Sequence, residues 1–169
     1  LPESGAILEY LVETHGNGRF IPVAGTPERL RYRYWMHYAE GSAMSPLLLK
    51  LVFSAVTKNA PFVIRPIAKA LAAGVGHAFI NPQIKTHYGY IESELGKHEW
   101  FAGSDLTAAD MQMSYPIEAS FARGDDGTRP HTKKWLDKVR ARPAYQRALE
   151  KGGHVLVDVL YDDGSLQAW

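Results

Sequence analysis

Hydrophobic residues recur at helical spacing along most of the chain. Near its start, apolar side chains three and four positions apart predict a short helix over residues 5–14, which His15-Gly16-Asn17-Gly18 ends. Residues 17–25 contain turn formers without a sustained period, which is typical of a linker between packed units. The pattern predicts a helical stub at residues 1–16, joined by a linker to the rest of the chain.

A long helix is predicted to follow. Thr26 is a good N-cap, and Pro27 occupies the first helical position, where its missing N–H does no harm. The apolar period runs to about Thr57, with a bend expected at Ser45-Pro46. Because large apolar groups lie on both sides, we expect this helix to be buried between neighbours, a second subunit being one option.

The remaining periodic segments also predict helices. Apolar residues recur from 61 to 95, and Asn81-Pro82 divides this run as either a kink or a new N-cap. Two further helices are predicted over 130–140 and 143–151. We expect residues 154–169 to form an extended tail, since their strand-like composition has no other strand to pair with.

The strongest local signal is a capping box. Thr107 can accept from the N–H of Asp110, whose carboxylate can accept from the N–H of Thr107, while Leu106 can pack on Met111 as a hydrophobic staple. This pattern fixes the start of a helix and occurs in many helical proteins.

Composition narrows the class of protein. The 169 residues are 46% hydrophobic and 22% charged, as in a globular protein, and periodicity makes residues 26–153 one all-α domain. A formal net charge of +1 provides no global attraction to nucleic acid or anionic lipid. Apolar stretches such as Pro46–Phe53 are shorter than a bilayer span of about 20 residues, so no membrane partner is expected. The absence of cysteine and of a signal peptide favours a cytoplasmic protein. His37-x-x-Glu40 has no second ligand pair, so no metal site is predicted.

Three motifs and two longer stretches follow one another along the chain. The motifs are Glu3-Ser4-Gly5-Ala6-Ile7 with Tyr10-Leu11, Trp100-Phe101-Ala102-Gly103 with Leu106–Asp110, and Arg142-Pro143-Ala144-Tyr145; the longer stretches are Tyr34–Ser42 and Met111–Ala119. In this order the motifs resemble the glutathione transferase family: the signature that ends its thioredoxin-like domain, its helical-domain capping motif, and the start of its last helix. The two longer stretches resemble the bacterial and fungal branch of that family.

The resemblance implies a carboxyl-terminal helical bundle preceded by a remnant of a thioredoxin-like, glutathione-binding domain. It implies glutathione as co-substrate, a small apolar electrophile as second substrate, and a homodimer. The family's catalytic Ser, Cys or Tyr lies on the missing first domain, so no catalytic residue is expected in this chain, and the chain alone should be inactive. The alternative is a non-catalytic helical module for protein association or apolar-ligand binding.

Glu3 and Ser4 are the candidate glutathione-binding residues. If Ser4 is the N-cap of a helix starting at Gly5, the N3 position is Ile7, so no capping-box carboxylate occupies the free N–H groups. An external carboxylate could bind there, while Glu3 pairs with an ammonium group. Together these groups suit an α-amino acid head, which by the resemblance is the γ-glutamyl end of glutathione. The alternative reading is plain N-capping.

The resemblance also implies an apolar pocket for the electrophile, between the long helix and the capped helix. It points to a face with His37, Glu40 and Met44, and with Tyr115 opposite. Each of these residues could equally be a core or interface residue.

Overall fold

A computed structural model describes residues 2–122 and 128–152. All of its regular elements are helical, and these residues form no strand beyond one isolated bridge between Trp100 and Gly103, which confirms the all-α prediction. The predicted tail, 154–169, lies outside the described residues. The α-helices are α1 (Ser4–His15), α2 (Pro27–Tyr38), α3 (Ser45–Asn59), α4 (Arg65–Val75), α5 (Asn81–Leu95), α6 (Ala108–Ala122), α7 (Pro130–Arg140) and α8 (Pro143–Gly152), with π-helical segments η1 (Ala39–Met44) and η2 (Gly76–Ile80).

The predicted long helix consists of α2, η1 and α3 in succession. Thr26 caps α2, its hydroxyl accepting from the N–H of Arg29 at 3.2 Å. The expected bend takes the form of the π-helical segment η1, which ends one residue before Ser45-Pro46. Pro46 has no N–H to give to the preceding turn, and the Ser45 hydroxyl donates to the carbonyl oxygen of Glu40 at 3.0 Å. A local widening of the helix thus accommodates the proline.

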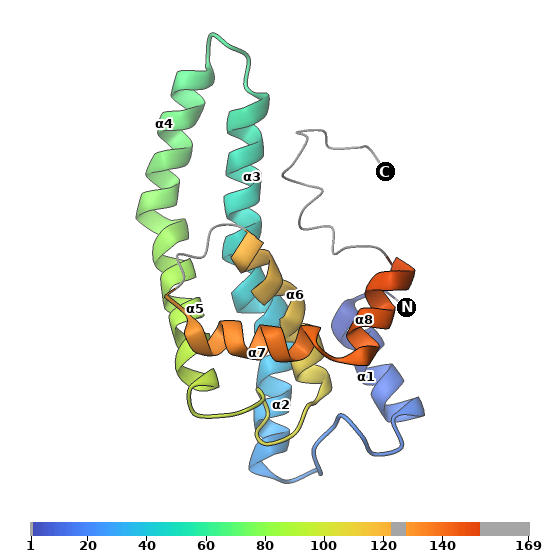
Figure 1. Ribbon diagram of the computed structural model, residues 1–169. Coiled ribbons are helices and arrows are strands. Elements are labelled where there is room, and N and C mark those ends of the chain that lie inside the picture. The colour runs from blue at the N-terminus through green and yellow to red at the C-terminus, as the bar shows by residue number, and fades with distance from the viewer. Residues whose placement is uncertain (1, 123–127, 153–169) are drawn as a thin grey trace.

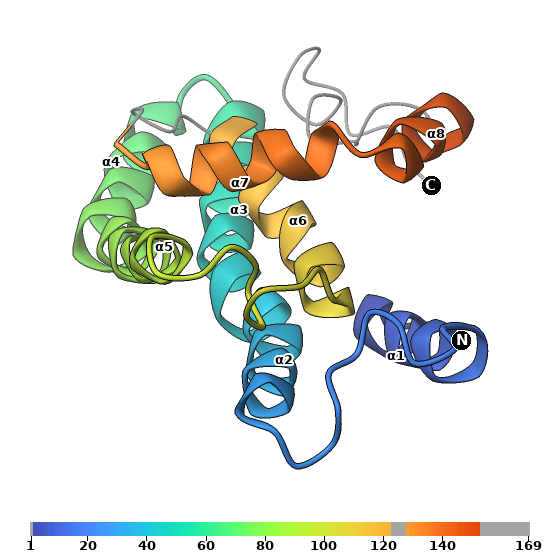
Figure 2. The ribbon, with the colours of Figure 1, turned by 60° about the horizontal axis from the view of Figure 1, so that its bottom comes forward.

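The helices form a packed body from which one hairpin extends. In the body, α6 packs against α2, η1, α1 and α7, while α7 also crosses α5 (Figures 1 and 2). The antiparallel pair α3 and α4, which we call the α3–α4 hairpin, projects beyond α6 and α7 (Figure 1). The hairpin is consequently less enclosed than the body.

Asn81-Pro82 lies where η2 passes directly into α5, and the Asn81 side chain makes no cap, so this dipeptide is not a new helix start.

Aromatic side chains of α2 and α5 form the centre of the core. Trp35 is 1% exposed, stacks on Tyr90 with ring centroids 5.4 Å apart, and contacts Phe101 at 4.5 Å. Phe101 in turn meets the ring of Trp135 from α7 edge-on at 5.1 Å. This chain of rings joins α2, α5, the loop before α6, and α7.

The continuous helix Pro27–Asn59 is long and apolar enough to cross a membrane by length and composition. Its most apolar 18-residue window has a mean hydropathy of 1.2, and 22% of that window is buried inside the molecule. A core helix of a soluble protein meets the same criterion, and Trp35 and Met36 lie in the core. The α3 part differs, because Leu48, Val52 and Val56 are about half exposed. Burial on both sides, expected from the sequence, is seen for neither part within this chain, because Leu30 and Tyr34 of α2 are also exposed, at 71% and 46%.

The start of α7 is capped from another helix. The carboxylate of Glu92 on α5 accepts from the N–H groups of His131 and Thr132, both at 2.8 Å, and from the Thr132 hydroxyl at 2.7 Å. Burial raises the pKa of Glu92, but the Thr132 and His131 bonds outweigh it and hold that pKa below its ordinary value. The cap favours the ionised carboxylate and fixes α7 on α5.

We expect Glu92→Gln to destabilise the fold by about 1–2 kcal/mol at neutral pH, because the amide replaces a charged acceptor at a helix N-terminus. A depressed folded pKa contributes stability above the unfolded value, about 4.3, that is lost as pH falls through the folded pKa. The difference between wild type and Glu92→Gln in urea unfolding should therefore shrink below about pH 4. Glu99→Gln, on an exposed side chain, is the matched control. An unchanged difference at all pH values would contradict the capping role.

Candidate functional site

The first turn of α1 is an open helix N-terminus. Ser4 is the first helical residue and Glu3 the cap position, so the predicted N-cap role of Ser4 is wrong. No side chain caps this end, and the first-turn N–H groups have no preceding turn to bond to. Glu3 has a φ of 74°, a left-handed conformation that costs a non-glycine residue about 1–3 kcal/mol and is commonest at functional sites.

Gln112 of α6 connects this turn to the long helix. Its side-chain amide donates to the Ser4 hydroxyl at 2.8 Å and lies 3.4 Å from a carboxylate oxygen of Glu40. Gln112 is only 4% exposed, so its position is fixed by packing. The Ser4 oxygen accepts this hydrogen bond, so the Ser4 O–H can donate to another group. Sequence reasoning missed Gln112, since no local pattern marks a residue that acts across 108 positions.

The four predicted pocket residues do not share one place. Glu40 and Met44 belong to η1, and Tyr115 to α6, which packs against η1. Met44 is partly buried against the core, and Tyr115 is 40% exposed. His37 is separate from Glu40, because it lines a groove of about 610 Å³ with residues of α2, η1 and α5: Leu30, Arg33, Tyr34, Tyr38, Ser42 and His87. The residues that line this groove do not include Glu40, Met44 or Tyr115.

Two tyrosine side chains, Tyr34 and Tyr38, line the groove that contains His37. The Tyr38 hydroxyl lies 2.7 Å from Nδ1 of His87, whose Nε2 is 3.1 Å from the side-chain oxygen of Gln83. Burial raises the pKa of Tyr38 far above its ordinary value, and burial with a bond to Tyr90 raises the pKa of Tyr34 to about 12. Both phenols are protonated at neutral pH, so neither serves as a base there.

Asp110 organises the start of α6 and the preceding loop. Its Oδ2 accepts from the N–H of Thr107 at 2.9 Å, and its Oδ1 from the N–H of Phe101 at 2.9 Å and the indole of Trp135 at 3.2 Å. The predicted bond from the Asp110 N–H to the Thr107 hydroxyl is not formed. Instead the Asp110 N–H bonds to the Thr107 carbonyl, and the Thr107 hydroxyl donates to the Asp110 carboxylate at 3.1 Å. Leu106 is partly buried against the core. Burial raises the pKa of Asp110, against the lowering effect of its donors. The Asp110 carboxylate thus joins the start of α6 to the preceding loop and to α7.

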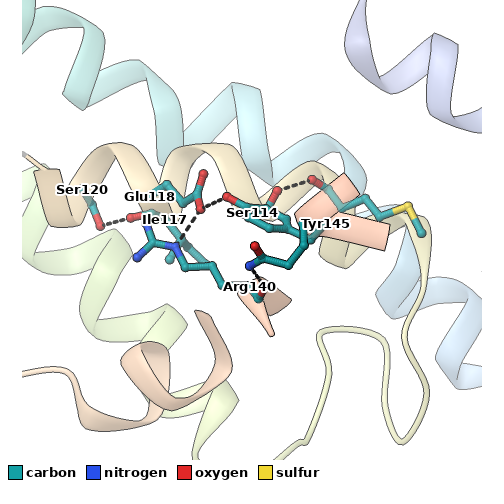
Figure 3. Close-up of polar contacts among 8 residues, drawn as sticks. Ser114, Ile117, Glu118, Ser120, Arg140 and Tyr145 are labelled. Atoms are coloured by element: carbon teal, nitrogen blue, oxygen red, sulfur yellow. Dashed lines mark hydrogen bonds and ion pairs between the residues drawn. The ribbon is translucent and has the colours of Figure 1, made fainter. Parts of the chain in front are cut away.

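A second buried carboxylate, Glu118 of α6, holds the carboxyl-terminal helices. Arg140 Nε lies 3.0 Å from Glu118 Oε1, and the hydroxyl of Tyr145 on α8 donates to the same oxygen (Figure 3). Burial, followed by the bond to Glu118, raises the pKa of Tyr145 to about 12. Through one carboxylate oxygen, the cluster connects α6, α7 and α8.

The start of α1 supplies groups that can bind a ligand. Among the described residues, no group of three His, Asp or Glu side chains is placed to hold a metal ion. The open first turn of α1 and the Ser4 hydroxyl are suited to a carboxylate. This part of the molecule can therefore bind and orient a ligand.

Comparisons with known proteins give a consistent family. Residues 62–152 match the model of "Glutathione S-transferase, C-terminal domain". Glutathione S-transferase 3 of Schizosaccharomyces pombe is 32% identical over 151 residues, 88% of this chain and 62% of that protein. Disulfide-bond oxidoreductase YghU of Escherichia coli is 25% identical, and this match covers 48% of that protein. The chain thus spans about half to two thirds of these relatives.

Solved structures show the same fold. A glutathione S-transferase from Actinobacillus pleuropneumoniae aligns with a TM-score of 0.74 and 24% identity, covering 97% of this chain and 69% of that one. The glutathione transferase URE2P6 from Phanerochaete chrysosporium, in complex with oxidized glutathione, aligns with a TM-score of 0.67 and 23% identity, covering 89% and 66%. With the family model matched over more than half of its residues, this chain belongs to the glutathione S-transferase family and contains its carboxyl-terminal helical domain.

Proposed function

We propose that this chain is the helical part of a glutathione transferase that conjugates or reduces small apolar electrophiles when joined to an upstream thioredoxin-like domain. The observation that carries the proposal is the open start of α1, where the Ser4 hydroxyl is fixed by Gln112. We expect the chain by itself to be inactive, because residues 2–122 and 128–152 place no group that we assign to activation of the glutathione thiol.

The start of α1 suits the amino-acid head of glutathione. A carboxylate placed there would accept from the first-turn N–H groups and from the Ser4 hydroxyl, and the helix dipole would favour its charge. The carboxylate of Glu3, just outside the helix, would pair with the adjacent ammonium group. Gln112 would act as a positioning residue, because it orients the Ser4 oxygen so that the hydroxyl proton faces the ligand.

The chemical step would require the upstream domain. A hydrogen bond from that domain to the glutathione sulfur would lower the thiol pKa and populate the thiolate at neutral pH. In conjugation the thiolate would attack the electrophilic carbon, forming a C–S bond while the leaving group departs with the bonding electrons. Glu40, Met44 and Tyr115 are the side chains of η1 and α6 that we assign to the electrophile pocket, together with His37, which lines the groove shared by α2, η1 and α5.

A non-catalytic role in protein association is the second candidate. It is favoured by exposed apolar side chains along the α3–α4 hairpin, including Val52 and Leu71 at 46% and 61% exposure. We propose a homodimer as the assembly, formed with a contribution from the upstream domain. Sedimentation of the longer protein distinguishes a monomer from a dimer.

The test of the enzyme proposal is an activity assay on the protein that includes the sequence encoded immediately upstream. Glutathione and a small aryl halide should give a thioether at a rate well above the uncatalysed reaction, and the 169-residue chain should give none. An upstream sequence without a thioredoxin-like pattern, or an inactive longer protein, would favour the association role.

Replacing Gln112 by methionine in the longer protein tests the positioning role. The thioether keeps the side-chain length but donates no hydrogen bond to Ser4, so we expect KM for glutathione to rise about tenfold, as for the loss of one bond of about 1.4 kcal/mol. The kcat should change little, because the bond is equally present before and during reaction. Gln83→Met, at a side chain of α5 that bonds to His87, is the matched control. A fall in kcat at constant KM would sink this assignment.

A further inference from the structure

The α3–α4 hairpin lies within a segment that has no acidic residue. Between Glu40 and Glu92 the sequence contains no Asp or Glu, and it contains five cations: Lys50, Lys58, Arg65, Lys69 and Lys85. Because the whole chain carries a formal net charge of +1, the remaining residues are net acidic. The overall charge therefore hides a strong asymmetry between the hairpin segment and the rest of the chain.

Four of these cations gather at one concavity. A groove of about 890 Å³ runs between α3 and α4, and its lining includes Lys50, Lys58, Arg65 and Lys69 together with His77. None of the residues lining this groove is acidic. Lys58, Arg65 and Lys69 are exposed and form no ion pair with a carboxylate of the described residues. The groove is consequently a site of positive potential.

The turn that joins the two helices is apolar and exposed. Phe62 is 85% exposed, Val63 83% and Ile64 50%, and they form the tip of the hairpin, at the end far from α2 (Figure 1). Ile67, one turn further along, is 71% exposed. Large apolar groups at a protruding tip have no partner in the described chain, while cations flank them on both sides. The tip and the groove thus combine apolar and cationic groups on one projecting element.

We propose that the tip of the α3–α4 hairpin docks on an anionic lipid bilayer surface. Phe62, Val63 and Ile64 enter the interfacial region, and the flanking cations contact lipid phosphates. Exposed apolar area and positive charge are the two features that together anchor a peripheral protein to anionic lipid. The hairpin does not span the bilayer, since Lys58 and Lys69 lie within its length and would be costly in the hydrocarbon core.

Charge and shape favour a bilayer over other occupants. A symmetric contact between the tips of two copies would bring Lys58, Arg65 and Lys69 against the same three cations. Nucleic acid would use the cations but leave the apolar tip in water. A fluid interface accepts a convex apolar tip without a preformed socket, and its phosphates neutralise the groove. The net charge of the chain predicted no attraction to anionic lipid, but net charge does not show that cations are concentrated on the hairpin.

The experiment is flotation of the 169-residue chain with vesicles of phosphatidylcholine, alone or with phosphatidylglycerol added. Binding should require phosphatidylglycerol and weaken at high ionic strength. The triple variant Lys58→Gln, Arg65→Gln and Lys69→Gln should bind about 100-fold more weakly, at roughly fivefold for each cation near the surface. These side chains are exposed, so the variant keeps its core, which circular dichroism verifies. The matched control replaces the exposed Lys133, Lys134 and Lys151 by glutamine and should bind as wild type.

Substitutions at the tip test how much its apolar side chains contribute to lipid binding. Phe62→Ser with Val63→Ser should lose most of the binding, whereas Val23→Ser, an equally exposed residue in the loop before α2, should not. In Phe62→Trp, addition of anionic vesicles should increase emission from the new indole and shift it to the blue, and brominated lipid should quench that increase. Inorganic phosphate should compete no better than chloride at the same ionic strength.

Three results would overturn the proposal. They are equal binding to phosphatidylcholine alone, equal loss of binding in the Lys133, Lys134 and Lys151 control, and selective competition by inorganic phosphate, which would identify a free-anion site. Concentration-dependent dimerisation that the Phe62 and Val63 variant abolishes, without vesicle binding, would assign the tip to a second copy instead.

Discussion

Asp110→Ala should destabilise the fold by about 3–5 kcal/mol, which is among the largest effects of any single replacement in this chain. Asp110 is fully buried, and its carboxylate accepts from the N–H groups of Phe101 and Thr107, the Thr107 hydroxyl and the Trp135 indole. Alanine would leave these buried donors without an acceptor and would open a cavity beside α7. Urea unfolding followed by circular dichroism measures the loss.

Asp105→Ala is the matched control for this prediction. Asp105 is exposed, lies in the loop that precedes α6, and accepts from the neighbouring Ser104 hydroxyl at 2.8 Å. Its replacement should change stability by no more than about 0.5 kcal/mol, as is usual at surface positions. A loss at Asp110 no larger than that at Asp105 would show that the Asp110 carboxylate does not hold the start of α6, the preceding loop and α7 together.

Removal of the Trp35 side chain should have an effect of similar size, about 3–5 kcal/mol for Trp35→Ala. The indole is 1% exposed and contacts the rings of Tyr90 and Phe101, so alanine would create a large cavity at the centre of the core. Trp35→Phe should recover part of the loss, because it keeps an aromatic ring in the same place. Tyr10→Ala, on a 55% exposed aromatic residue, should be nearly neutral. Equal losses for Trp35→Ala and Tyr10→Ala would contradict this description of the core.

Local sequence signals were sufficient to predict the helices. Thr26 with Pro27 marked the start of α2, and the period of apolar residues gave α7 and α8 to within one residue. These features depend on interactions within one or two helical turns, which a sequence pattern contains. The π-helical form of the bend at η1 was not predicted, because it depends on how the long helix packs while accommodating Pro46.

The connections between helices could not be predicted in the same way. Gln112 with Ser4, and Glu92 with Thr132, are pairs separated by 108 and 40 residues, and neither partner carries a distinguishing local pattern. His37 was grouped with Glu40 and Met44 by the family resemblance, and in the structure His37 lines a groove shared with α5. Which neighbour each helix face meets is decided by tertiary packing, and that information is absent from spacing alone.

A calorimetric titration of glutathione tests whether the start of α1 is one half of a glutathione site whose other half lies on an upstream domain. The 169-residue chain should give no saturable heat at millimolar glutathione, since Glu3 and Ser4 alone hold only one end of the ligand. The longer protein should bind, and Ser4→Ala should weaken that binding about tenfold, the equivalent of one hydrogen bond of about 1.4 kcal/mol, while Ser104→Ala should not. Millimolar or tighter binding by the chain alone, or unchanged binding by Ser4→Ala in the longer protein, would contradict the account.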